Sequence, residues 1–225
     1  MGFLMTHLIF YRSDLTGPTW YMYHHIYNRG AHKAPIFLDS NDYWRFLKLL
    51  YISNSTRPFK LAGYPDNAVF SADRVKTIVT ITAYCLMPNH FHIVLAEDKD
   101  GNITKFMRKL CTGYSVYYNV KYKHSGTIFQ GKYKSKPVAD DLYYETVLNY
   151  VHLNPYGLEE PVLEKSAYAE YFKQAFECSK RYEYSSFKDY LGEHREQGAI
   201  LQVGPDRSDL TGIISSPAIP APPCS

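Results

Sequence analysis

Hydrophobic and polar positions alternate between strand-like and helix-like patterns along the centre of the chain. Residues 20–28 are aromatic and β-branched and end at a turn, which predicts a first strand. From about 41 to 54, hydrophobic residues recur at helical spacing after Ser40 or Asn41 as a cap, which predicts an amphipathic helix. Residues 55–74 hold prolines and turn formers, so we expect a loop there.

The following segments continue this alternation of patterns. Residues 76–86 and 90–97 are strand-like and flank a tight connection, so they predict a hairpin. Residues 102–120 carry one hydrophobic stripe and predict a helix, whereas 127–138 alternate and predict a fourth strand. Residues 140–155 begin with an acidic cap and run helically to Pro155.

The order of these elements is β-α-β-β-α-β followed by a helix. This order predicts an α+β fold, the ferredoxin-like split βαβ sandwich, with an antiparallel sheet and an additional C-terminal helix. We divide the chain into an N-terminal extension (1–19), the main domain (20–158), a C-terminal helical extension (159–195) and a Pro/Ser-rich disordered tail (196–225). The hexapeptide RSDLTG occurs at 12–17 and 207–212, outside the predicted core.

Composition narrows the class of protein. No apolar run approaches the roughly 20 residues of a membrane span, and the N-terminal segment lacks signal-peptide features, so we expect a soluble cytoplasmic protein. The four cysteines never form a C-x-x-C pair, which predicts reduced thiols rather than disulfides or a cysteine-bound zinc ion.

Basic residues are concentrated in one part of the chain. From Lys99 to Lys136 there are nine Lys or Arg against one acid, Asp100, although the whole chain has a formal net charge of only +3. Tyrosines are interleaved with them, a pattern typical of proteins that bind nucleic acids. Lysines are, however, also common on ordinary solvent-exposed surfaces. The candidate DNA-binding residues on the predicted helix and strand are Lys105, Arg108, Lys109, Lys132, Lys134 and Lys136.

The stretch MPNHFHIVL (87–95) places two histidines one residue apart in a strand. Side chains alternate along a strand, so His90 and His92 project from the same face and can together hold a divalent cation. Histidine pairs also occur without metal, and the two side chains could instead be polar residues of a half-exposed strand.

The last predicted helix supplies two further candidates. Tyr150 and Asn154 are four residues apart and therefore share a helix face. A tyrosine can act as a nucleophile, and an amide oxygen is a ligand for Mg²⁺ or Mn²⁺. Two imidazoles and one amide oxygen favour a site that tolerates several divalent ions, with Mn²⁺ better suited than Mg²⁺. Taken alone, Tyr150 fits a packed tyrosine better than a nucleophile.

Three motifs in order resemble a known family. The chain contains, in this order, the motifs YCLMPNHFHIVL, GTIFQGKYKS and YVHLNP, followed by YEYSSFKDYLG. These motifs resemble those of the single-tyrosine HUH transposases and, among these, of the REP-associated tyrosine transposases. The resemblance covers about residues 20–158 and implies a ferredoxin-like fold. It implies that His90 and His92 bind the metal, that Asn154 is the third ligand, and that Tyr150 is the nucleophile.

The resemblance also implies an activity. Such an enzyme binds single-stranded DNA at hairpin or repeat sequences and, with Mg²⁺ or Mn²⁺, cleaves and rejoins it through a 5′-phosphotyrosine intermediate. Related enzymes occur as homodimers and as monomers. On this basis we expect a DNA transposase whose last predicted helix is catalytic, with His152, His24 and His25 in packing or DNA-contacting roles rather than as ligands.

Two other classes of protein share these features. A non-catalytic single-stranded nucleic-acid-binding module would use the same sheet, basic stretch and tyrosines. A metal-dependent hydrolase would use the histidines to activate water and would release its products without forming a covalent adduct.

Overall fold

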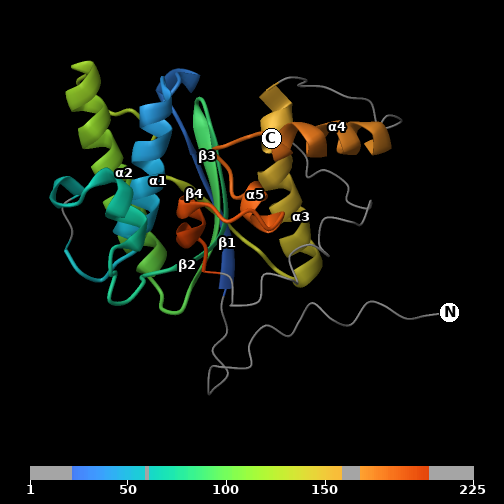
Figure 1. The fold of residues 1–225 in the computed structure, drawn as a ribbon, viewed down its shortest axis with the longest axis horizontal. Helices are drawn as coiled ribbons and strands as arrows, with labels where there is room; N and C mark the ends of the chain where they lie inside the picture. Colours follow the sequence, from blue (N-terminus) through green and yellow to red (C-terminus); the bar gives the residue numbers. More distant parts are fainter. Residues whose placement is uncertain (1–21, 59–60, 159–167, 203–225) are drawn as a thin grey trace.

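A computed structural model describes residues 22–58, 61–158 and 168–202, and Figure 1 shows the path of the chain. The strands are β1 (Met22–Arg29), β2 (Thr80–Met87), β3 (His90–Glu97) and β4 (Lys134–Pro137). The helices are α1 (Ser40–Ser53), α2 (Asn102–Tyr122), α3 (Asp141–Leu153), α4 (Tyr168–Lys180) and α5 (Phe187–Tyr190). Short 3-10 helices occur at Ala31–Lys33, Leu61–Gly63, Asp66–Ser71, Asn154–Leu158 and Glu196–Ile200. The N-terminal extension and both RSDLTG segments lie outside the described residues.

The four strands form one antiparallel sheet in the order β2-β3-β1-β4. With α1 and α2 as the two connections, this is the ferredoxin-like arrangement, and the predicted fold class is confirmed. The fourth strand is shorter than the predicted 127–138. Phe129 makes an isolated bridge to Gly30, the chain then bends at 130–132, and regular pairing with β1 begins only at Lys134.

Each face of the sheet has its own hydrophobic cluster, because side chains alternate along a strand. The sheet residues in the cluster with α1 and α2 include Ile26, Phe91, Ile93 and Leu95. The sheet residues that pack on α3 are Ala83, Cys85, Met87 and Val94. Val147 and Val151 of α3 close this second cluster, and Figure 1 shows α1 and α2 on one side of the sheet and α3 on the other. His90 and His92 alternate in step with Val94 and therefore belong to the α3 face.

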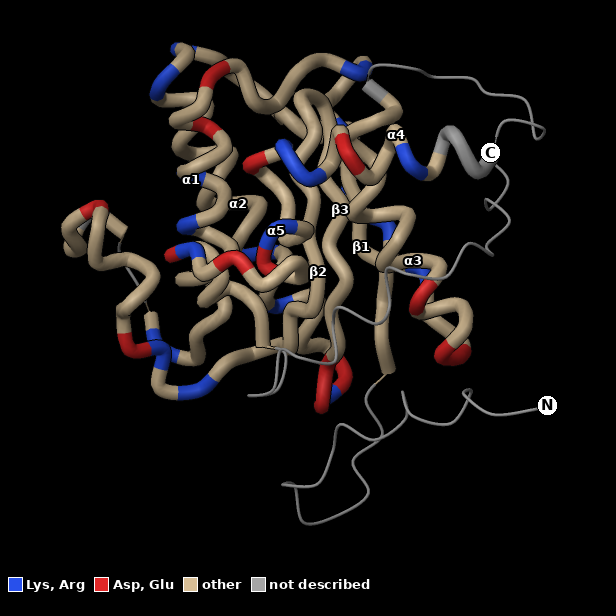
Figure 2. The backbone as a smooth tube through the Cα atoms, turned by 45° about the vertical axis from the view of Figure 1, so that its right-hand side comes forward, with Lys and Arg blue, Asp and Glu red and all other residues tan. Residues whose placement is uncertain are grey.

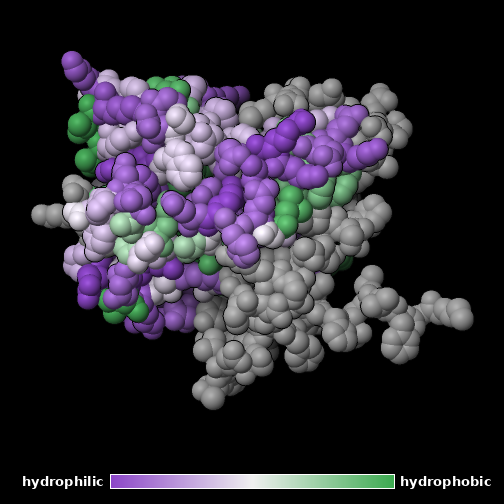
Figure 3. All heavy atoms as spheres, viewed as in Figure 1, coloured by the Kyte–Doolittle hydropathy of each residue, from purple (hydrophilic) through white to green (hydrophobic). Residues whose placement is uncertain are grey.

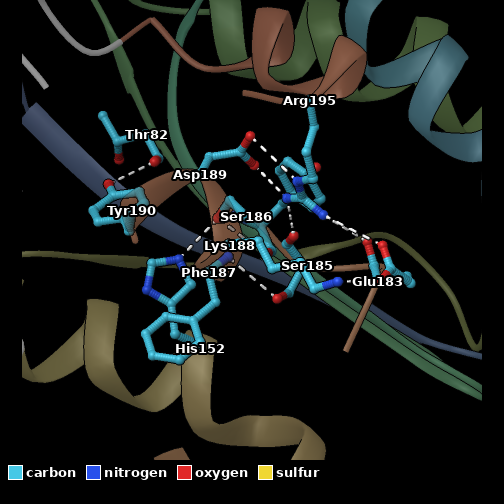
Figure 4. Close-up of polar contacts among 11 residues, drawn as sticks. Thr82, His152, Glu183, Ser185, Ser186, Phe187, Lys188, Asp189, Tyr190 and Arg195 are labelled. Carbon is cyan, nitrogen blue, oxygen red and sulfur yellow. Dashed lines mark hydrogen bonds and ion pairs between the residues drawn. The ribbon is translucent and has the colours of Figure 1, made fainter. Parts of the chain in front are cut away.

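The C-terminal motif, YEYSSFKDYLG (182–192), follows the outer edge of β2. The backbone N–H of Ser186 donates to the carbonyl of Tyr84 at 2.9 Å, and the hydroxyl of Tyr190 donates to the carbonyl of Thr82 at 2.7 Å. Arg195 forms an ion pair with Asp189 and so closes this segment on itself (Figure 4). The motif thus covers a sheet edge that would otherwise present unpaired backbone groups.

The fold continues beyond the point where the sequence predicted a disordered tail. Residues 196–202 are described, and Ile200 is fully buried in the cluster beneath α1. The backbone N–H of Gln202 donates to the carbonyl of Ile81 at 2.9 Å, and its side-chain oxygen accepts from the N–H of Ile81. The predicted disorder is therefore wrong for 196–202, because this short segment docks on the first residues of β2. Residues 203–225 lie outside the described part.

Hydrophilic side chains cover most of the described part of the face drawn in Figure 3, and the hydrophobic patches on that part are small and separate. No described helix is long and apolar enough to cross a membrane.

Candidate active site

The first part of the site is the start of β3, where His90 and His92 lie side by side. Their ring centroids are 5.1 Å apart, and the rings are nearly perpendicular. His92 is 5% exposed, whereas His90, at the first position of the strand, is only partly buried. Pairing with β1 sets His90 opposite Arg29 and His92 opposite Tyr27. The sequence prediction that both histidines share one face is confirmed by this register.

Helix α3 carries the second part of the site across the same face. It begins after Asp140, whose carboxylate accepts a hydrogen bond from the backbone N–H of Tyr143 at 2.8 Å. Its hydrophobic residues pack on the sheet, which leaves Tyr150 beside the histidines. The Tyr150 ring meets that of His92 edge-on, with centroids 5.3 Å apart, and 39% of the residue remains exposed. Tyr150 is therefore both next to His92 and reachable from outside.

Asn154 follows the last turn of α3 and reaches His90. Its side-chain oxygen Oδ1 lies 3.3 Å from His90 Nε2. On the other side of the ring, His90 Nδ1 lies 2.6 Å from the side-chain oxygen of Asn89. Burial lowers the pKa of His90 to about 4, an effect that Asn154 opposes and Arg29 reinforces, so this imidazole is neutral at pH 7.

The protonation of His90 makes its contact with Asn154 unusual. A neutral imidazole has one N–H, and the short contact with the Asn89 oxygen requires that N–H at Nδ1. His90 Nε2 then carries a lone pair that faces the Asn154 oxygen, another hydrogen-bond acceptor. Two acceptors in this position are stabilised by a cation between them, and atoms that each bind one small ion at about 2.1 Å lie about 3 Å apart. The donor set of imidazole nitrogen and amide oxygen therefore fits a divalent ion.

His92 is held by a histidine from the neighbouring strand. Its Nδ1 lies 2.9 Å from Nε2 of His25, and both side chains are buried. Burial, and after it the charge of His25, holds the pKa of His92 well below its usual value of 6.5. This arrangement leaves His92 Nε2 as the nitrogen available to an ion. In the described residues, no group of three or more His, Cys, Asp or Glu side chains is arranged to hold a metal, so a site here depends on the amide oxygen of Asn154.

Two of the predicted DNA-binding lysines lie on the same face as this site. In the pairing of β1 with β4, Lys134 is opposite Tyr27 and Lys136 is opposite His25. Directly opposed residues share a face, so both lysines project from the face that carries the histidines, and both are exposed. Lys132 precedes β4, and its Nζ lies 5.6 Å from the centre of the Tyr133 ring.

The other predicted basic residues belong to α2, in the layer on the opposite side of the sheet. Lys105 and Arg108 are exposed there. Lys109 donates from Nζ to the carbonyl of Ser55 at 2.6 Å, which ties α2 to the end of α1. The structure therefore does not bring these three side chains to the face with the histidines. Figure 2 shows acidic positions along the first part of α3.

Of the remaining histidines that the sequence singled out, His152 and His24 have other partners than Tyr150, whereas the His25 ring lies beside the Tyr150 ring. His152 is 3% exposed, its Nε2 lies 2.8 Å from Ser186 Oγ (Figure 4), and burial lowers its pKa to about 3. Its role is thus to join α3 to the C-terminal motif. His24 points to the opposite face from His25, with Nδ1 2.9 Å from Ser135 Oγ. The contact of His25 with His92 had no signal in the sequence beyond the neighbouring pair His24-His25, because it depends on the register of β1 against β3.

Part of the chain matches the sequence model of a known family. Residues 69–154 match the sequence model of a family described as "Transposase IS200 like", and the matched region contains His90, His92, Tyr150 and Asn154. Among solved structures, the chain is similar to one described as "Structure of the REP associates tyrosine transposase bound to a REP hairpin". That similarity has 12% sequence identity and a TM-score of 0.47, and it covers 82% of this chain and 90% of the other. No curated protein sequence matches this chain.

Proposed function

We propose that this chain, whose residues 69–154 match the model of the IS200-like transposase family, cleaves and rejoins single-stranded DNA by forming a covalent bond to Tyr150. The observation that carries the proposal is the meeting of α3 with the start of β3. Tyr150 packs on His92, and the Asn154 oxygen faces His90 Nε2 at 3.3 Å. One nucleophile candidate and three ligand candidates thus converge from two elements that the chain connects only through α2 and β4.

A divalent ion would be held by His90, His92 and Asn154. Mg²⁺ or Mn²⁺ at this place would polarise a non-bridging oxygen of the scissile phosphate and offset the charge that develops there. The three protein ligands leave room for substrate oxygens, because a six-coordinate ion has further positions. Imidazole ligands make Mn²⁺ the better fit of the two ions.

Tyr150 supplies the nucleophilic oxygen. The hydroxyl loses its proton and forms a new bond to phosphorus, while the bond between phosphorus and the 3′ oxygen of the upstream nucleotide breaks and that oxygen takes up a proton. The products are a protein-bound 5′-phosphotyrosine and a free 3′-OH. One phosphodiester is exchanged for another, so a second 3′-OH can later displace Tyr150 without ATP.

The basic side chains of the same face would hold the DNA backbone. Lys134 and Lys136 on the edge strand, and Arg29 opposite His90, lie on the face of the sheet that carries the site. Phosphate contacts of this kind position a strand without reading its sequence, and exposed aromatic rings can stack unpaired bases. From the motif resemblance we propose a single strand that contains a hairpin as the substrate.

A labelled-oligonucleotide experiment separates this proposal from both other classes. A hairpin-containing single strand from the DNA that flanks the gene is labelled at one end in each reaction, incubated with Mn²⁺, and run on a denaturing protein gel. We expect the 3′-end label in a protein-sized band and the 5′-end label only in a shortened free strand. Cleavage without a protein-bound label would instead indicate a water-activating hydrolase, and binding without cleavage would indicate a non-catalytic module. A protein-bound 5′-end label would contradict the proposed polarity.

A further inference from the structure

His25 is a buried histidine that belongs to none of the motifs that carry the family resemblance. It lies on β1, is 7% exposed, and its Nε2 is 2.9 Å from His92 Nδ1. The two rings are inclined by only 28°, with centroids 5.0 Å apart. The contact is therefore a hydrogen bond between one ring nitrogen of each imidazole.

Strand register accounts for this contact. Tyr27 of β1 is directly opposite His92, and His25 is two residues earlier on the same face, so it is the diagonal neighbour of His92. The Tyr27 ring lies 5.2 Å from that of His25, and the Tyr150 ring meets it edge-on at 5.8 Å. These two aromatic rings restrict the orientations open to the His25 imidazole.

We infer that His25 is a positioning residue: its Nε2 accepts a hydrogen bond from Nδ1–H of His92 and so keeps the Nε2 lone pair of His92 directed toward the divalent ion. The inference rests on the proposed function, since it concerns the ligand set of the same site. A neutral imidazole has a single N–H, and the hydrogen bond at one nitrogen decides which nitrogen remains free for a metal. Without the acceptor at His25, the proton of His92 could occupy Nε2 and block the ion.

Three other roles for His25 fit the structure less well. Direct metal ligation is disfavoured for His25 Nε2, because that nitrogen is already engaged with His92. A DNA contact is disfavoured because the side chain is 7% exposed. Simple packing remains the alternative to test, and it predicts that an apolar side chain of similar size would serve equally well.

The variants that separate positioning from packing are His25→Leu, His25→Gln and His24→Ala. Leucine fills a similar volume without an acceptor. Glutamine can place its side-chain oxygen near the position of His25 Nε2 and accept the same hydrogen bond. His24→Ala is the matched control, because His24 is adjacent in the chain but lies on the opposite face beside Ser135. Urea unfolding of each variant checks that the fold is retained.

The first measurement is the tautomer of His92 in the metal-free protein, by long-range ¹H–¹⁵N correlation on ¹⁵N-histidine-labelled samples, with the signal assigned by its loss in His92→Gln. We expect Nδ1–H in the wild type, in His25→Gln and in His24→Ala, and a shift toward Nε2–H in His25→Leu. A wild-type signal for Nε2–H would overturn the inference, as would an unchanged Nδ1–H in His25→Leu. This readout needs neither metal nor DNA, so it is independent of whether Tyr150 forms an adduct.

The second measurement is Mn²⁺ binding by calorimetry. Loss of a partner that orients a metal-binding histidine lowers metal affinity by about 10- to 100-fold, so we expect a drop of that size in His25→Leu. We expect His25→Gln to stay within about threefold of the wild type, and His24→Ala to be unchanged. Equal affinities for His25→Leu and the wild type, or a loss in His25→Gln as large as in His25→Leu, would overturn the inference. If the wild type bound Mn²⁺ and these changes occurred without any DNA adduct, the proposed function would fail while the role of His25 stood.

Discussion

His90 Nε2 and the side-chain oxygen of Asn154 lie 3.3 Å apart, although 64 residues separate them in the sequence. The other nitrogen of the His90 ring, Nδ1, donates its N–H to the Asn89 oxygen, so His90 Nε2 is an acceptor. The contact with Asn154 therefore brings two hydrogen-bond acceptors together. The same helix that delivers Asn154 places Tyr150 beside His92. The position of α3 on the sheet therefore determines both the candidate ion site and the candidate nucleophile.

Asn154 is expected to bind the ion through its amide oxygen. Replacement by alanine removes that oxygen, and we expect Mn²⁺ affinity in calorimetry to fall by about tenfold or more, since about 1.4 kcal/mol corresponds to a factor of ten. Asn154→Asp supplies a carboxylate oxygen at the same place and should bind Mn²⁺ at least as tightly as the wild type. If Asn154 instead donated a hydrogen bond to His90, Asn154→Ala would leave Mn²⁺ affinity unchanged.

Metal binding and DNA binding are expected to be separable. The double variant His90→Ala with His92→Ala removes both imidazole ligands but leaves the basic edge of the sheet, and phosphate contacts dominate affinity for nucleic acid. We expect cleavage to be lost while the dissociation constant for single-stranded DNA, measured by fluorescence anisotropy, stays within about threefold of the wild type. Undiminished cleavage by this variant in chelator-treated buffer would contradict the ion site.

The two basic regions are expected to differ in their effect on DNA binding. Lys134 and Lys136 lie on the face with the histidines, whereas Lys105 and Arg108 lie on the other side of the sheet. Replacing the first pair with alanine should weaken single-strand binding and reduce the log-log salt slope by about 0.7 for each phosphate that a lysine no longer neutralises. The matched double variant of Lys105 and Arg108 should change the slope much less. The reverse order of effects would place the DNA on the α2 side.

Part of this site could be predicted from local sequence patterns alone. Strand alternation alone places His90 and His92 on one face, and helical spacing alone places Tyr150 and Asn154 together. The fold class also follows from the order of elements, and the strand pairing confirms it.

Other features depend on contacts that no local pattern contains. The hydrogen bond between His25 and His92 requires the register of β1 against β3, which is set by pairing between distant segments. The fourth strand begins late because the chain bends around Gly131. Residues 196–202 have no strong helical or strand pattern, yet Ile200 is buried in the hydrophobic cluster beneath α1.

Asp42 is expected to make stability depend on pH. Its carboxylate is fully buried and accepts hydrogen bonds from Lys121, from Tyr117 and Tyr122, and from the backbone N–H of Leu38. Burial alone would raise its pKa, but these donors together lower it below the usual 3.8. A carboxyl whose pKa is depressed on folding contributes stability above its unfolded pKa and loses that contribution as the pH falls through the folded value.

The corresponding variant is Asp42→Asn. We expect it to lower the free energy of unfolding at pH 7 by about 1–3 kcal/mol, the range for a buried hydrogen-bond partner, with the difference shrinking below about pH 4. Urea unfolding across this pH range measures both. Asp66→Asn is the control, because Asp66 also pairs with a lysine, Lys48, but its side chain is 92% exposed. A loss at pH 7 no larger than that of Asp66→Asn would contradict the role given to Asp42.

The most direct test of the whole account is to find which residue becomes attached to DNA. The adduct formed with Mn²⁺ is digested with nuclease and trypsin, and tandem mass spectrometry locates the remaining nucleotide on the peptide that spans 135–165. This peptide contains Tyr143, Tyr144, Tyr150 and Tyr156, so each candidate is present in one spectrum. We expect the nucleotide on Tyr150 alone, and no adduct from Tyr150→Phe, which keeps the ring but lacks the attacking oxygen. A nucleotide on another tyrosine, or an undiminished adduct in Tyr150→Phe, would contradict the account.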